Sequence, residues 1–352
     1  MLKNFKNTIS KPIYLGMLLL VILLLLSYIL RKNDFEKVTG APNLQATYHV
    51  LLTITALNEG RSENNFYLPT VSLGMESDKN IPWGLTVPTK SGDYIYTSFT
   101  PVGFLAPYLW FKAFNLEPSV NNLAEFNFFL GCLSASILFL LLVSLLRFNG
   151  YDSWGSVFGA LVGVAIGIFS REALQSFGIV YWSHSLYQPI LISSILFLFK
   201  YLTSEIEDKR RTYAYIIAFT AFIGAMTEWT GYVFNAGMIF LLIIKNRSFS
   251  YAKVLAILIA IGTATAGIIT VFHYSIAVGF EPAISSFLGR FLGRNITKGS
   301  LVNLIQGYSL SYGFFILTIF TTITLAYFGN RQQATGNRYN NIRARFISNR
   351  RN

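Results

Sequence analysis

The stretch Asp93–Phe114, DYIYTSFTPVGFLAPYLWFKAF, marks the point where a long polar segment gives way to sequence apolar enough for a membrane. It is rich in aromatic residues and is interrupted by Pro101, Gly103 and Pro107. Proline inside a helix removes a backbone hydrogen bond and kinks or ends the helix. The stretch is therefore too broken for an ordinary spanning helix, and we expect it to form the external shoulder of a helix bundle.

The composition of the whole chain indicates an integral membrane protein. Of its 352 residues, 53% are hydrophobic and 12% are charged, and the mean hydropathy is +0.48, whereas a soluble domain has about 25% charged residues. The net charge of +12 would suit a nucleic-acid-binding protein. In so apolar a chain, however, the charges belong in loops and tails, where they report topology. We therefore expect no nucleic-acid partner.

Cysteine and histidine usage gives no metal motif. The chain has one cysteine, Cys132, and its three histidines are widely separated. This spacing excludes a disulfide framework and a cysteine-rich metal site. The sequence predicts no metal site and no cofactor, and it leaves a requirement for a divalent cation open.

Hydrophobic segments predict an all-α polytopic membrane protein with about eight transmembrane helices. The first segment, 1–30, has no small-residue cleavage site, so we interpret it as an uncleaved membrane helix rather than a signal peptide. One later segment has glycine at every fourth position from Gly155 to Gly167, a pattern typical of close helix packing. The seven later segments are Leu123–Leu146, Trp154–Phe169, Val180–Tyr201, Tyr213–Trp229, Tyr232–Ile244, Val254–Tyr274 and Ser309–Phe328.

Four regions follow from this pattern. They are the helix at 1–30, an extracytoplasmic loop with interfacial helices at 31–114, a bundle at 115–329 with an outer basic loop at 275–305, and a basic tail at 330–352. Basic residues gather at alternate helix ends, and the positive-inside rule then places both termini in the cytoplasm. We expect the tail to be disordered. Within the loop, we expect a surface helix at Leu44–Leu57, followed by turns and short extended pieces.

Ionisable residues at membrane depth are functional candidates because a charge there is costly. Glu228 falls at the outer end of a predicted helix, where it is either a functional acid or an interfacial residue in contact with water. Arg171 stands beside Glu172, where a helix-end ion pair is the alternative to a binding role. His49 and His184 are predicted on the same external side, each as a functional group or as an interfacial ring.

A basic stripe is predicted in the outer segment Ala283–Lys298. Arg290, Arg294 and Lys298 are spaced four residues apart, so a helix would place them on one side, next to an apolar face suited to a membrane surface. Two interpretations stand. The stripe anchors to anionic headgroups, or it holds the phosphates of a lipid-linked substrate, since arginine makes multidentate phosphate contacts.

The layout of one helix, a large external loop, the segment Tyr94–Phe114 and a bundle resembles the GT-C superfamily of membrane glycosyltransferases over residues 1–200. The resemblance implies a polyprenyl-phosphate-linked sugar donor, transfer on the outer face, and an Asp or Glu early in the first loop as the base. The corresponding stretch here, Ala41–His49, contains Asn43 and Gln45 and no carboxylate. The remaining candidates for the base are Asp34, Glu36, Glu59, Glu63 and Glu228, with His49 as a substitute.

The resemblance therefore implies a glycosyltransferase of a bacterial inner membrane, active in polysaccharide biosynthesis at the cell envelope. Its partners would be membrane lipids, the lipid-linked sugar and a glycan or lipid acceptor. In this scheme Glu228→Gln and His49→Ala each abolish glycan product. Three substrate-binding candidates, Arg290, Arg294 and Lys298, would hold the donor phosphate. The others are Arg171 and His184, and Tyr94, Tyr96 and Trp83, which would stack on sugar rings.

Three alternatives stand beside this interpretation. A polysaccharide polymerase or ligase would use the same substrates and differ in the length of its product. A non-catalytic or truncated relative would explain the missing carboxylate. A transporter or flippase would require polar residues deep in several spans, whereas these segments are mainly Leu, Ile, Phe, Ala and Gly.

Overall fold

A computed structural model describes residues 11–35, 44–61, 63–72, 86–175, 178–245 and 250–293, and a few positions between 302 and 309. The chain divides into two units, residues 1–295 and 296–352. In the second unit, the described positions are helical. Everything below concerns the first unit.

Four of the described helices are long and apolar enough to cross a membrane. They are α1 (Lys11–Phe35), α4 (Val120–Phe148), α7 (Ser183–Thr203) and α10 (Ser250–Val278). Large apolar side chains such as Leu18 and Ile268 are exposed on them, as expected for helices that face lipid. The prediction of an all-α, membrane-type protein is thereby confirmed, while the total of eight spans stays a prediction.

Several of the other described helices also coincide with predicted segments. Helices occur at seven of the eight predicted hydrophobic segments, and the eighth, Ser309–Phe328, lies outside the described residues except for Ser309 itself. The tail at 330–352 also lies outside them. The other described helices are α2 (Leu44–Ala56), α3 (Val102–Phe114), α5 (Ser153–Ile168), α6 (Arg171–Gln175), α8 (Glu207–Thr227), α9 (Trp229–Lys245) and α11 (Phe280–Gly293), with a π-helical turn at Leu57–Arg61.

Helix α1 continues beyond the predicted boundary at residue 30 because its charged end is packed against protein. Arg31 is buried, and its Nη2 donates to the Ser27 hydroxyl (2.7 Å) and the Ile168 carbonyl (3.3 Å). Its guanidinium also lies 5.4 Å from the ring centroid of Phe128. These contacts stabilise the helical conformation as far as Phe35. The charged cluster therefore does not mark the helix end.

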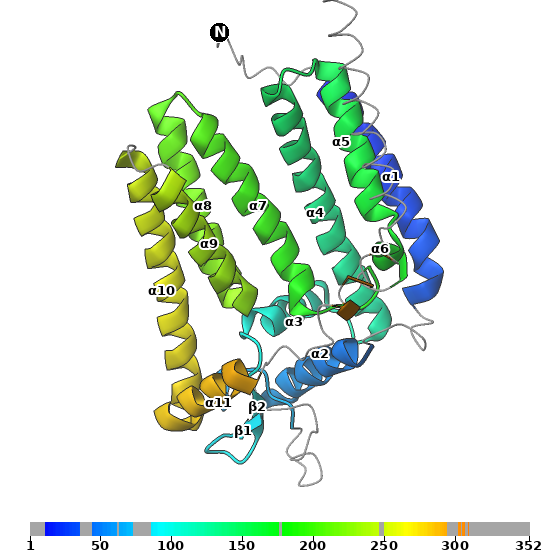
Figure 1. Cartoon of the computed structure of the whole chain (residues 1–352). Helices are drawn as coiled ribbons and strands as arrows, with labels where there is room; N and C mark the ends of the chain where they lie inside the picture. The colour runs from blue at the N-terminus through cyan, green and yellow to red at the C-terminus, as the bar shows by residue number, and fades with distance from the viewer. Residues whose placement is uncertain are drawn as a thin grey trace, which may run out of the picture. The chain divides into compact units, whose positions relative to one another are not determined.

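Helices α4, α7, α8 and α10 pack as successive neighbours, with α5 and α1 beside α4 and with α9 against α8 and α10 (Figure 1). The predicted glycine ridge packs on α4 through its two central members. A Cβ at Gly159 would lie 3.0 Å from Leu146 Cδ1, and one at Gly163 would lie 2.9 Å from Leu142 Cδ1. Gly167 has nothing within 4 Å. The ridge therefore allows close approach over about two turns only.

Helices α2 and α3 pack where α4 and α7 begin, and we call this the loop end of the bundle (Figure 1). A short antiparallel hairpin, β1 (Thr86–Pro88) and β2 (Tyr94–Tyr96), belongs to the same part of the chain. The helix and the short extended pieces predicted for the loop are thus present, while the position of that helix at a membrane surface stays a prediction. The loop also contacts α10, which continues to Val278 instead of ending at Tyr274, because its last turns pack on Leu68 and Ile95.

Basic residues gather at the opposite end from α2 and α3. The rings of Phe126 and Tyr181 meet at the loop end, and those of Phe148 and Phe199 meet at the other end, so α4 and α7 run parallel. Arg147 therefore lies away from the loop end, as does the basic start of α8, which follows α7. The predicted cytoplasmic position of both termini depends on this separation of basic residues from the loop end.

Candidate functional site

A break between two helices positions the Glu228 side chain at the loop end. Glu228 is extended (φ −155°, ψ 143°) between α8 and α9, and its backbone N–H still bonds to the Gly224 carbonyl at 3.0 Å. A Cβ at Gly231 would lie 2.4 Å from the Gly224 oxygen. The sharp break therefore requires glycine at position 231.

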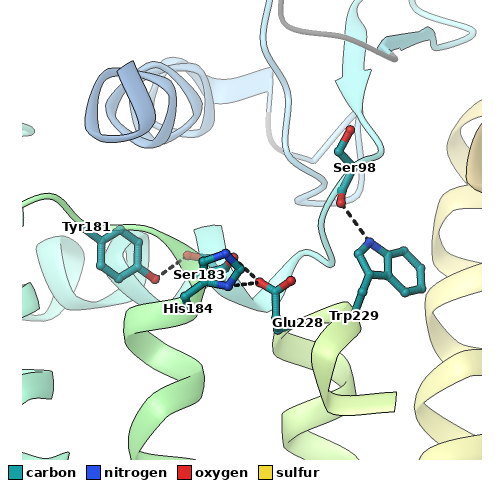
Figure 2. Close-up of polar contacts among 7 residues, drawn as sticks. Ser98, Tyr181, Ser183, His184, Glu228 and Trp229 are labelled. Atoms are coloured by element: carbon teal, nitrogen blue, oxygen red, sulfur yellow. Dashed lines mark hydrogen bonds and ion pairs between the residues drawn. The ribbon is translucent and has the colours of Figure 1, made fainter. Parts of the chain in front are cut away.

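The carboxylate of Glu228 is buried, accepts a hydrogen bond from Ser183 and lies next to the imidazole of His184. Ser183 Oγ donates to Oε2 at 2.5 Å, and His184 Nδ1 lies 3.1 Å from the same oxygen (Figure 2). Ser183 and His184 are the first two residues of α7, where the helix dipole favours a negative charge. The side chain of Glu228 is 1% exposed and that of His184 is 52% exposed. A buried acid is thus joined to an accessible imidazole.

This geometry favours one tautomer of His184. With its proton on Nδ1, the imidazole can donate to the nearby Glu228 oxygen, which then acts as the acceptor. A neutral imidazole that donates through Nδ1 keeps its lone pair on Nε2. His184 is therefore arranged to accept a proton from outside, and Glu228 to stabilise the resulting positive charge.

Buried aromatic side chains hold the segment 96–103 against this site. Trp229 Nε1 donates to the Ser98 carbonyl (2.8 Å), and the Tyr181 hydroxyl donates to the Gly103 carbonyl (2.6 Å) (Figure 2). Burial raises the pKa of Tyr181 well above its usual range, so this hydroxyl stays a donor. Tyr274 OH adds bonds to two further carbonyls, those of Tyr96 (3.1 Å) and Phe99 (2.9 Å).

Gly103 permits the close approach of α3 to the start of α7. A Cβ added there would lie 2.6 Å from Ser183 Cβ, and this distance is far below an ordinary contact. The stretch Asp93–Phe114 therefore contacts Ser183, the hydrogen-bond partner of Glu228. Its predicted role as a shoulder of the bundle agrees with this contact.

His49 is placed in a different environment from His184. Its side chain is 4% exposed, and its ring centroid lies 4.3 Å from that of Tyr96 and 5.5 Å from those of Phe104 and Trp182. Burial lowers the pKa of His49 from 6.5 to about 4, so the ring is neutral at pH 7. Because it is enclosed by aromatic rings, we no longer expect it to serve as the base that meets an acceptor.

Two other predicted acids, Asp34 and Glu59, are exposed, and Glu36 lies outside the described residues. Asp34 lies at the end of α1, and Glu59 lies in the turn after α2. Among the candidates for the base that the structure describes, Glu228 is the one placed next to an accessible histidine. Burial and the contact with His184 therefore favour Glu228 over the other catalytic candidates.

The predicted substrate-binding residues lie in different environments, and some lie outside the described residues. His184 lies at the site, whereas the Tyr96 ring is buried against His49, so it is not available for stacking on a sugar in this conformation. Tyr94 is half-buried in β2. Arg171 begins α6 and Arg290 lies on α11. The side chains of Arg171 and Arg290, and the whole of Trp83, Arg294 and Lys298, lie outside the described residues.

Sequence reasoning missed Ser183 and Asp93 as hydrogen-bonding residues. Ser183 stands beside His184, but its partner Glu228 is 45 positions away, and no spacing rule links the two. Asp93 accepts hydrogen bonds from Asn65 and Ser72 at the base of the loop. An aspartate followed by a β-strand gives no local signal of such a network.

No protein-family model matches the chain, and comparison with curated proteins gives no significant match. Among the residues that the structure describes, no group of three His, Cys, Asp or Glu side chains is placed to hold a metal ion. The geometry of the site and the sequence layout therefore carry the functional argument.

Proposed function

We propose that this protein is a membrane glycosyltransferase of the GT-C type that transfers a sugar from a polyprenyl-phosphate donor. The loop end would face the outside of a bacterial inner membrane, with both termini in the cytoplasm. The product would belong to a cell-surface glycan. The observation that carries the proposal is the buried Glu228 carboxylate bonded to Nδ1 of a half-exposed His184.

In the proposed reaction, a hydroxyl of the acceptor gives its proton to His184 Nε2. The hydroxyl oxygen then forms a bond to the anomeric carbon of the donor sugar. The bond between that carbon and the phosphate oxygen breaks, and polyprenyl phosphate leaves with the electron pair. Glu228 stabilises the imidazolium, as carboxylates do in other histidine-based catalytic pairs.

General base catalysis by a positioned side chain contributes about 10² to 10⁴ in rate. Three features of the site favour it here. The base is accessible, its orienting acid is buried, and the apolar surroundings strengthen their interaction because the local dielectric is low.

The experiment uses the purified full chain in lipid nanodiscs with a panel of polyprenyl-phosphate sugars. Mass spectrometry of the lipid and glycan fractions detects transfer, and glycans from cells with and without the gene identify the natural product. His184→Ala should reduce transfer by about 10² or more. The control is Tyr151→Ala, which alters an exposed side chain between α4 and α5. Transfer by His184→Ala at the unaltered rate would refute the proposed base.

A further inference from the structure

Two adjacent aromatic residues after α2 adopt an unusual backbone conformation. Phe66 has φ 55° and Tyr67 has φ 57°, in the left-handed region that is unfavourable for a residue with a side chain. Both side chains stay exposed, at 43% and 41%. Strain of this kind persists when the surrounding structure enforces it, and it is found most often at functional sites.

Buried polar contacts fix the base of this loop. The amide of Asn65 donates to Asp93 Oδ2 at 2.9 Å and accepts from Ser91 Oγ at 3.1 Å. Ser72 Oγ donates to the other oxygen of Asp93 at 3.2 Å. Because Asn65 and Asp93 are buried, this network is shielded from water and is correspondingly strong.

Two further contacts fix the other side of the loop. Leu68 is fully buried in a cluster with Ile95 and Tyr274. The His273 ring nitrogen Nε2 lies 2.6 Å from the carbonyl oxygen of Phe66. The loop is therefore held from both sides, and the two aromatic side chains are presented to solvent without the entropic cost of ordering them on binding.

The exposed side chains have the chemistry that recognises a saccharide. The apolar C–H face of a pyranose ring packs on an aromatic face, and its hydroxyl groups bond to planar carboxylate or amide groups. Glu63 and Asn64, immediately before the aromatic pair, are exposed and supply such groups. A neighbouring charged residue also opposes burial of these rings in the hydrocarbon of a bilayer.

The aromatic pair lies at the same end of the bundle as His184. Leu68 packs on Tyr274, whose hydroxyl bonds to the Phe99 carbonyl, and the Phe99 ring lies 5.9 Å from that of His184. We propose that Phe66 and Tyr67 form a platform that binds the saccharide part of the acceptor. This inference rests on the proposed function for the role of that saccharide, but the binding itself needs no turnover.

Saturation-transfer NMR with the full chain in nanodiscs measures the binding. The probes are maltotetraose, cellotetraose, chitotetraose and mannotetraose. The double variant Phe66→Asn with Tyr67→Asn removes both rings while keeping residues that tolerate the left-handed conformation. We expect about tenfold weaker binding of the preferred glycan, and thermal stability equal to or above that of the unaltered protein. Tyr151→Ala, which removes an exposed tyrosine at the opposite end, should leave binding unchanged.

Phe66→Tyr with Tyr67→Phe keeps both rings and should retain binding. Equal binding by the double asparagine variant would overturn the platform, as would the absence of a signal for every glycan with the unaltered protein. Quenching of a Phe66→Trp variant by brominated lipid, beyond that of the unaltered protein, would also overturn it in favour of a membrane anchor. Glycan binding without any sugar transfer would leave the platform standing and refute the proposed function.

Discussion

Glu228 and Asp93 are both buried carboxylates at the loop end, yet their partners differ. Asp93 is bonded to Asn65, Ser72 and other neutral groups, which belong to the loop that it organises. Glu228 is bonded to Ser183 and to His184, whose ring is half exposed. The contacts described for the first carboxylate are with amide and hydroxyl groups, whereas the second lies next to an accessible imidazole.

In this comparison, Asp93 has a structural role in the loop, and Glu228 has the proposed role in proton transfer. Burial alone does not distinguish them, since both side chains are almost inaccessible. The distinguishing property is a path for a proton from the carboxylate's partner to solvent. We therefore expect substitutions at the two acids to act on different measurements.

The largest effect is expected for Glu228→Gln. The amide keeps the shape of the side chain but removes the charge that stabilises protonated His184, so the transfer rate should fall by about 10² to 10⁴. Sugar transfer by the purified variant measures this. Thermal unfolding should show that the fold is kept, and an unaltered rate would place Glu228 in the same structural class as Asp93.

The next effect concerns His49 and pH. Its folded-state pKa of about 4 lies below the ordinary 6.5, so between these values the unfolded chain binds the proton more readily. The free energy of unfolding should therefore fall by about 3 kcal/mol as the pH drops from 6.5 to 4, and then level off. Thermal unfolding of the unaltered protein and of His49→Phe over this range measures the difference.

A substitution of the exposed histidine, His184, provides the control for this test. His184→Gln should keep the acid destabilisation that His49→Phe removes. If His49→Phe is as acid-sensitive as the unaltered protein, the neutral, enclosed His49 ring is not what limits stability at low pH.

A smaller loss of stability is expected for Asp93→Asn. The amide cannot accept at both positions, so one of the buried donors from Asn65 and Ser72 loses its partner. Such a loss costs about 1–3 kcal/mol. Denaturant or thermal unfolding measures it, and glycan binding at Phe66 and Tyr67 should weaken with it. The His184-dependent chemical step should be retained, and its complete loss would contradict the separation of the two acids.

The smallest effect is expected for Tyr181→Phe, which leaves the Gly103 carbonyl without its donor. The cost should be about 1 kcal/mol, measured by thermal unfolding. Tyr187→Phe is the matched control, because its buried hydroxyl has no hydrogen-bond partner among the described residues. Equal effects for both variants would mean that the bond to Gly103 does not stabilise the loop end.

The sequence predicted the positions of most helices because a run of apolar residues specifies a membrane-type helix without reference to the rest of the chain. It also selected Glu228, since an acid at the end of an apolar segment is conspicuous. It misplaced the end of α1, because the charge of Arg31 looks exposed in sequence and is buried against Ser27 and Phe128 in the fold. It indicated His49 and His184 equally as functional candidates, although the His49 ring is enclosed and the His184 ring is accessible.

The sequence by itself determined the class of protein, the places of the helices and the short list of ionisable residues. These follow from composition and local periodicity, which act over one helix at a time. Only the tertiary structure decided which acid meets which histidine, because the contact between Glu228 and His184 joins the end of one helix to the start of another. The same holds for the loop that presents Phe66 and Tyr67, whose conformation depends on Asp93 and His273 far along the chain.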